Sequence, residues 1–264
     1  MLNLTPTVRN LLIANVILFA LQDNVLRILT QVGSLYPFGS AYFYPWQLIT
    51  YMFLHGSWGH LLSNMFGLFS FGPLLEQRWG GQRFLVFWLI CGFGAGLLYE
   101  GVRMVELRPI SELQQSIVQN PTGGEFGQLV RTARGSSLYA ADDLALAGAL
   151  ARSPNDETLR HDVAARAQEI YQEVLASPML GASGALFGVL FAFAYLFPNT
   201  ELMLLFFPFP IKAKYFVFFY GLYELFRGVH RTPGDNVAHF AHLGGLLIGF
   251  LVLKFWERGR ERFY

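Results

Sequence analysis

The hydrophobic pattern divides the 264-residue chain into long apolar stretches separated by polar segments. A helix needs about 20 mostly apolar residues to cross a bilayer, and six stretches meet or approach that length. The first is interrupted by a polar cluster at residues 22–24, and the fifth is short. We therefore predict six membrane-spanning helices, near residues 10–31, 49–74, 84–101, 181–198, 213–228 and 238–256.

One long segment, residues 102–178, lacks this apolar character. It carries seven arginines and ten acidic residues, a net charge of −3. The motif NPTGGEFG in its first half predicts a loop. The second half predicts an amphipathic helix with Asn155 or Asp156 as its cap. The apolar residues that recur there at helical spacing are Leu159, Val163, Ala167, Ile170 and Val174.

The pattern therefore predicts three parts. Residues 1–101 hold the first three spans, and residues 179–264 hold the last three and a tail. Residues 102–178 form a helical insertion outside the membrane, which lies on the membrane surface or packs over the bundle. Because no small-x-small cleavage site follows the first span, we expect that span to be retained.

Composition makes a soluble globular protein untenable. Apolar residues make up 53% of the chain and charged residues 14%, with a mean hydropathy of +0.38. Ordinary soluble domains contain roughly 25% charged residues. A net charge of +1 gives no reason to expect a nucleic-acid partner. The single cysteine, Cys91, excludes an intrachain disulfide and is expected to pack as a small apolar residue. The fold class is an all-α membrane protein.

Lysine and arginine predict the orientation of the chain in the membrane. With the N-terminus inside, nine basic residues fall in inner segments: Arg9, Arg78, Arg83, Lys212, Lys214, Lys254, Arg258, Arg260 and Arg262. The short outer loops hold two, Arg227 and Arg231, and the outer loop at 32–48 holds none. We therefore predict that both termini face the cytoplasm.

Polar residues inside spans are costly and are functional candidates by default. In YMFLHGSWGHLLSNMFG, His60 and Asn64 share a helix face, whereas His55 lies off that face. The fourth span opens with GASG, where Ser183 follows Gly181 and precedes Gly184.

In VAHFAHLGGLLIG, His239 and His242 share a face of the sixth span. Gly245 and Gly249 form a small-xxx-small pair, which favours close helix contact. On its own, GASG is equally consistent with an exposed nucleophile and with close helix packing.

Topology brings these motifs together. Spans two, four and six all run from outside to inside, so their candidates lie at one depth near the outer surface. A serine, a histidine and further donors there predict a nucleophile with its base. A metal site is the weaker alternative, because HExxH is absent and no predicted span pairs a carboxylate with a histidine at ligand spacing.

The residues as a set resemble the rhomboid family of intramembrane serine proteases, over about 40–100 and 179–256. The motifs that carry the resemblance are WQLITYMFLHGSWGHLLSNM, GASG and AHLGG. The resemblance implies that Ser183 is the nucleophile and His242 its base. It also implies that His60, Asn64 and the backbone N–H of Ser183 stabilise the oxyanion. His55, Gly181, Gly184, Phe187 and Gly245 would support them.

Three features depart from the family pattern. Gln47 follows Trp46 where the family often has an arginine, and residues 102–178 are longer than expected. Phe187 keeps the ring that often stacks on the base but lacks a hydroxyl. The resemblance gives Trp46 and Glu76 structural roles. His239 either tunes His242 or, as we favour, faces the watery mouth of the site.

The resemblance implies a serine endopeptidase that cleaves transmembrane segments of membrane proteins near the outer leaflet, within the lipid bilayer. Its Ser183–His242 dyad would lack an orienting carboxylate and would depend on packing at Gly245 and Gly249. No cofactor and no metal are expected. The location would be a cell membrane, of the bacterial inner type. The alternative is a catalytically silent rhomboid-like binder or chaperone of membrane proteins.

Overall fold

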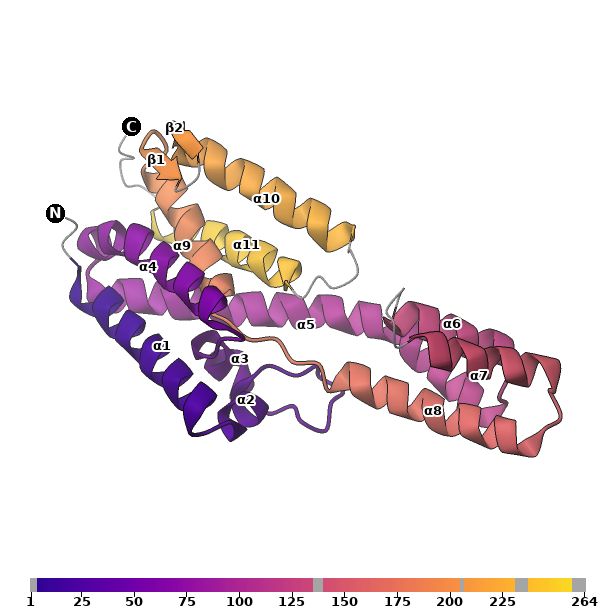
Figure 1. Cartoon of the computed structure of the whole chain (residues 1–264). Coiled ribbons are helices and arrows are strands. Elements are labelled where there is room, and N and C mark those ends of the chain that lie inside the picture. The colour runs from indigo at the N-terminus through magenta and orange to yellow at the C-terminus, as the bar shows by residue number, and fades with distance from the viewer. Residues whose placement is uncertain (1–3, 135–139, 205–206, 231–236, 258–264) are drawn as a thin grey trace.

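The central element of the fold is a helix that is buried on almost every side. In the computed structural model, which describes residues 4–134, 140–204, 207–230 and 237–257, α9 (Ser183–Leu196) packs against four other helices. Nearly all of its residues are buried, because its sequence is apolar all round. Figure 1 shows the other helices of the bundle arranged around it.

Every predicted span contains a helix. These helices are α1 (Pro6–Asn24), α4 (Trp58–Trp79), α5 (Gly81–Gln119), α9, α10 (Ala213–Val229) and α11 (His239–Trp256). Within the described residues, α5 and α11 are long and apolar enough to cross a membrane by length and composition. The all-α bundle is therefore confirmed, while the number of six spans stays a prediction.

Two predicted span boundaries are wrong. The first helix ends at Asn24, inside the polar cluster, and a separate short helix, α2 (Ile28–Gly33), follows it. The second span is divided into α3 (Gln47–Thr50), a 3-10 turn (Tyr51–Phe53) and α4. Leu54 and Ser57 are extended, and the Ser57 side chain caps α4 by accepting from the His60 N–H. His55 therefore lies before the helix.

A two-stranded antiparallel hairpin connects α9 to α10, which the sequence did not predict. It consists of β1 (Glu201–Leu204) and β2 (Phe207–Lys212), with Glu201 opposite Lys212. Arg231, Arg258, Arg260 and Arg262, which were counted in the charge asymmetry, lie outside the described residues.

The segment 102–178 is built on an extension of α5. This helix has 39 residues, about 58 Å at 1.5 Å per residue, and so continues well past the predicted end of the third span. Its distal part packs with α6 (Gly123–Arg134), α7 (Ala140–Arg152) and α8 (Glu157–Leu175) around a separate apolar core. Figure 1 places these helices at the far end of α5, so they do not pack over the bundle.

The predicted amphipathic helix is confirmed as α8. Val163, Ala167 and Ile170 are fully buried, and Asp156 accepts from the N–H groups of Thr158 and Leu159. The loop predicted at NPTGGEFG is wrong in its second half, because α6 already begins at Gly123. The buried Phe126 anchors that first turn in the insertion core.

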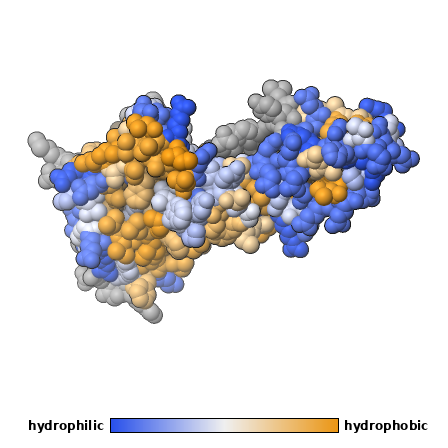
Figure 2. Space-filling model, turned by 90° about the horizontal axis from the view of Figure 1, so that it is seen from below, coloured by the Kyte–Doolittle hydropathy of each residue, from blue (hydrophilic) through white to orange (hydrophobic). Residues whose placement is uncertain are grey.

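The surface differs between the two parts of the molecule. Figure 2 shows apolar residues gathered on the bundle, whereas the insertion is mostly hydrophilic. On α10 alone, Phe218, Phe219, Leu222 and Phe226 are exposed. Exposed apolar surface on this scale suits contact with lipid and would be unfavourable in water.

Gln47 organises the loop that precedes α4. It is fully buried; its Oε1 accepts from the N–H groups of Tyr36 and Tyr44, and its Nε2 donates to the carbonyls of Val32 and Tyr42. This side chain thus anchors the loop in the place where the family often has an arginine.

Candidate active site

Ser183 is the first residue of α9, and the preceding backbone is fixed. Met179 pairs with Leu35, and the N–H of Gly181 donates to the Tyr51 carbonyl over 2.9 Å. Gly181 has a φ of +132°, a conformation that a residue with a Cβ rarely adopts. The first N–H groups of a helix have no acceptor within the helix, so the start of α9 presents backbone donors beside the half-buried Ser183.

His242 lies in the first turn of α11 and reaches Ser183. Its Nε2 lies 2.8 Å from Ser183 Oγ, a good distance for a hydrogen bond. Phe187, one turn after the serine, stacks on the imidazole with ring centroids 4.2 Å apart and an interplanar angle of 8°. The sequence-derived nucleophile, base and stacking ring are therefore brought together, although their catalytic roles stay predictions.

Glycines let α9 and α11 approach closely enough for that contact. A Cβ on Gly245 would overlap the carbonyl oxygen of Gly184. A Cβ on Gly249 would lie 2.9 Å from the Cα of Gly188. A Cβ on Gly188 itself would collide with the buried Cys91 of α5 and lie 3.3 Å from the Gly245 carbonyl oxygen. The two helices are thus in backbone contact along the small-residue seam.

Glu224 is the site residue that the sequence analysis missed. It projects from α10, is 2% exposed, and its Oε2 lies 2.9 Å from His242 Nδ1 and 2.6 Å from His239 Nδ1. His242 therefore has a carboxylate partner from another helix, and the expectation of a base without an orienting carboxylate is wrong. A glutamate inside the apolar run KYFVFFYGLYELF was the available signal.

His239 does not face a watery mouth. Its side chain is 5% exposed and contacts the same carboxylate oxygen as His242. The expectation that it opens to water is therefore wrong.

These three side chains are also a candidate cation site. Their ligand atoms lie within 4.8 Å of one another. Ligand atoms around a tetrahedral zinc ion stand roughly 3.3 Å apart, given metal–ligand bonds near 2.0–2.1 Å. The observed separations of 2.6 and 2.9 Å from the carboxylate oxygen are shorter and correspond to hydrogen bonds. The absence of a metal stays a prediction.

His60 faces the serine from the start of α4. A Cβ on Gly181 would lie 2.7 Å from His60 Nε2 and 3.7 Å from Ser183 Oγ, so the imidazole edge and the hydroxyl border the same space. Its Nδ1 accepts a long hydrogen bond of 3.5 Å from the Gly56 N–H. That contact favours the tautomer with a proton on Nε2.

Asn64 and His55 support α4 and the turn before it. Asn64 is buried, and its Nδ2 donates to the His60 carbonyl over 3.1 Å. His55 packs edge-on against His60, and its backbone exchanges hydrogen bonds with the Gln22 side chain. The structure thus places His60 beside Ser183, while the hydrogen bond of Asn64 is to its own helix.

Trp46 and Glu76 have structural contacts, as expected. Trp46 donates from its indole to the Val32 carbonyl. Glu76, near the end of α4, accepts from the Thr5 hydroxyl and from the N–H groups of Thr7 and Val8. This carboxylate fastens the start of α1 to α4.

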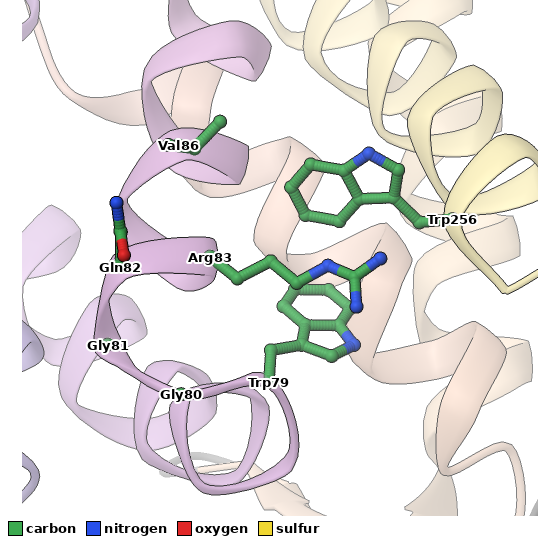
Figure 3. Close-up of a pocket in the computed structure, with 7 residues that line it drawn as sticks. All are labelled: Trp79, Gly80, Gly81, Gln82, Arg83, Val86 and Trp256. Carbon is green, nitrogen blue, oxygen red and sulfur yellow. The ribbon is translucent and has the colours of Figure 1, made fainter.

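A hollow of about 490 Å³ lies away from this chemistry. Residues 79–83 at the turn between α4 and α5 line it, together with Val86 and with Trp256, the last residue of α11. Figure 3 shows Arg83 reaching towards the indoles of Trp79 and Trp256, with its guanidinium 4.7 Å from the Trp256 ring centroid. Trp256 is about 20 Å along α11 from His242, so the hollow is not part of the serine site.

Comparison with known proteins identifies related sequences. The family model for the rhomboid domain matches residues 43–105 and 123–256. "Rhomboid protein 1, mitochondrial" of Saccharomyces cerevisiae is 39% identical over 92 residues, 33% of this chain and 26% of that protein. "RHOMBOID-like protein 12, mitochondrial" of Arabidopsis thaliana is 26% identical over 218 residues, 82% of this chain and 48% of that protein. No solved structure matches.

The chain spans about half or less of the length of these relatives. Their names place them in mitochondria, so the comparisons do not support a bacterial inner membrane. The family model covers well over half of the chain, including α4, α9, α10 and α11, the helices that carry the site residues. The chain therefore belongs to the rhomboid family and is a multi-pass membrane protein.

Proposed function

We propose that this chain is an intramembrane serine endopeptidase that cleaves transmembrane segments of membrane proteins. The observation that carries the proposal is the 2.8 Å contact between Ser183 Oγ and His242 Nε2. A serine hydroxyl is a weak nucleophile unless a neighbouring base takes its proton, and this contact supplies that base. Membership of the rhomboid family supports the same reaction.

In the proposed reaction, Ser183 Oγ bonds to the substrate carbonyl carbon as its proton passes to His242 Nε2. The carbonyl electron pair moves to oxygen, where His60 Nε2–H and the first N–H groups of α9 can donate. As the intermediate collapses, the peptide C–N bond breaks and His242 gives its proton to the leaving amine. A water molecule then attacks the acyl carbon and gives its proton to His242 Nε2. The bond between that carbon and Ser183 Oγ breaks, the new carboxyl terminus leaves, and His242 returns the proton to Ser183 Oγ.

The position of the site within the membrane bears on the substrate and on the leaflet in which it is cleaved. A helical peptide bond has its carbonyl already hydrogen-bonded, so the substrate helix must unwind locally before attack. We propose single spans with small or helix-breaking residues near their outer end as substrates. The excess of lysine and arginine in the inner segments supports cleavage near the outer leaflet, with both termini on the opposite side.

The test is labelling of isolated membranes by a fluorophosphonate probe, which needs no substrate. Wild-type protein should be labelled, and Ser183→Ala and His242→Ala should each abolish labelling. Ser70→Ala is the matched control, because Ser70 is half-buried on α4, like Ser183 on α9, and donates to the Phe66 carbonyl of its own helix. Labelling that persists in Ser183→Ala would refute the nucleophile. A folded but unlabelled wild type would favour the silent binder or chaperone.

A further inference from the structure

Glu224 occupies the inner face of α10, although every polar group there is costly in a membrane. The buried residues of this helix are Ala213, Val217, Glu224 and Gly228, which recur at helical spacing. Large apolar side chains cover its other faces and are exposed, where they can meet lipid. A carboxylate in this place needs strong partners to be tolerated, and an ionisable residue inside a membrane commonly has a functional partner.

The partners of this carboxylate set the proton positions on two imidazoles. Glu224 Oε2 lies 2.6 Å from His239 Nδ1 and 2.9 Å from His242 Nδ1. An ionised carboxylate only accepts hydrogen bonds, so each Nδ1 must carry the proton. In neutral His242, Nε2 is then unprotonated and can accept the hydroxyl proton of Ser183, 2.8 Å away.

We propose that Glu224 is a positioning residue that completes a Ser183–His242–Glu224 triad, with His239 as the second donor that holds the carboxylate. The inference rests on the proposed protease function and deepens it. The carboxylate orients the imidazole and stabilises the positive charge that His242 gains when it takes the serine proton. The stacked Phe187 covers the face of the same ring.

The decisive substitution is Glu224→Gln. Its amide can donate to Nδ1 of His242, which would favour the tautomer with a proton on Nε2 and so block the base. In a serine protease triad, the equivalent loss of the carboxylate lowers kcat by about 10⁴-fold. We expect kcat for a transmembrane reporter and the fluorophosphonate labelling rate to fall by about 10²–10⁴-fold. KM should stay the same, because Glu224 is buried and contacts His242 on the nitrogen opposite to the one that faces Ser183.

Two further variants separate orientation from folding. Glu76→Gln is the matched control, since Glu76 is a buried carboxylate with three donors near the far end of α4. It should lower the thermal unfolding midpoint but leave the labelling rate intact. Glu224→Asp keeps the charge but withdraws it by one methylene, so its kcat should lie between those of wild type and Glu224→Gln.

The full chain reconstituted in liposomes would be compared across these variants, with Ser183→Ala as the blank. A wild-type kcat in folded Glu224→Gln would overturn the triad and leave the protease assignment intact. Rates that fall only in step with the unfolding midpoint, as in a structural role, would also overturn it. If Glu224→Gln does not fold, a wild-type kcat in Glu224→Asp would count against the proposal. Labelling of Ser183→Ala would instead refute the protease function.

Discussion

At the residue scale, Gly181 is a position where no other amino acid fits. Its φ of +132° disfavours any side chain, and a Cβ there would lie 2.7 Å from the His60 ring. We expect Gly181→Ala to displace His60 or Ser183, to lower the fluorophosphonate labelling rate at least about tenfold, and to destabilise the protein by about 1–3 kcal/mol.

Gly101→Ala is the matched control for that substitution. Gly101 lies within α5, and a Cβ there meets no atom within 4 Å. Alanine at a helical position is favoured over glycine by about 1 kcal/mol, so this variant should be at least as stable as wild type. Thermal unfolding in detergent and the labelling rate would be measured together. Wild-type values for Gly181→Ala would show that the backbone before Ser183 is not strained.

The residue scale also shows which parts of the site can be predicted from sequence. Ser183 and His242 were found because each belongs to a short motif with glycine neighbours. Glu224 has no such motif, and it meets the histidines only because α10 packs beside α11. His239 was expected to face water because the sequence does not show that Glu224 lies beside it. When the role of a side chain depends on a helix that is distant in sequence, it can be recognised only from the packing of the helices.

At the scale of elements, the contact between α9 and α11 sets the distance from nucleophile to base. Gly245→Ala would place a methyl group against the Gly184 carbonyl, so the helices must separate or slide. We expect this variant to lose about 1–3 kcal/mol of stability, the usual cost of overpacking, and to be labelled more slowly by the fluorophosphonate probe.

Gly221→Ala provides the comparison on α10. A Cβ at Gly221 would lie 3.2 Å from the end of the Leu246 side chain, which can move aside. Its stability should therefore change by less than about 1 kcal/mol. The unfolding midpoints and labelling rates of the two variants would be measured side by side. Equal effects would mean that the Gly184–Gly245 contact does not position His242.

Helices were predicted better than their ends. The apolar runs located all six bundle helices, because the need to bury or immerse apolar side chains is visible in the sequence. The start of α4 was misplaced because residues 49–57 are apolar enough to continue the span. The break is local: Leu54 is extended and ends the 3-10 turn, and Ser57 is extended and caps α4. Such backbone breaks leave little trace in hydropathy.

At the scale of the whole molecule, the described residues of the insertion build an apolar core separate from that of the bundle, and α5 contributes to both. The return from α8 to α9 is fixed before it reaches the site, because Met179 pairs with Leu35 and Gly181 donates to Tyr51. We therefore expect substitutions inside the insertion to leave the geometry around Ser183 unchanged. This division makes the stability of the two parts separable by experiment.

Arg166 offers the means to test that separation. Its guanidinium contacts Asp143 at 2.7 Å and also reaches Glu169 and Glu173, and these acidic partners raise the pKa of Arg166 above its usual value. Arg166→Gln should destabilise the insertion by about 2 kcal/mol, because it removes the charge-assisted hydrogen bonds that the nearly buried Asp143 accepts from this guanidinium.

The expected result is faster proteolysis of the insertion at an unchanged fluorophosphonate labelling rate. Arg108→Gln is the control, since its ion pair with Glu112 is largely exposed and worth about 0.3–0.5 kcal/mol. Proteolysis of that variant should match wild type. A labelling rate that falls together with the protease resistance of Arg166→Gln would mean that the insertion holds the site in place through α5 or through the Met179 strand pair. The two cores would then have to be treated as one cooperative unit.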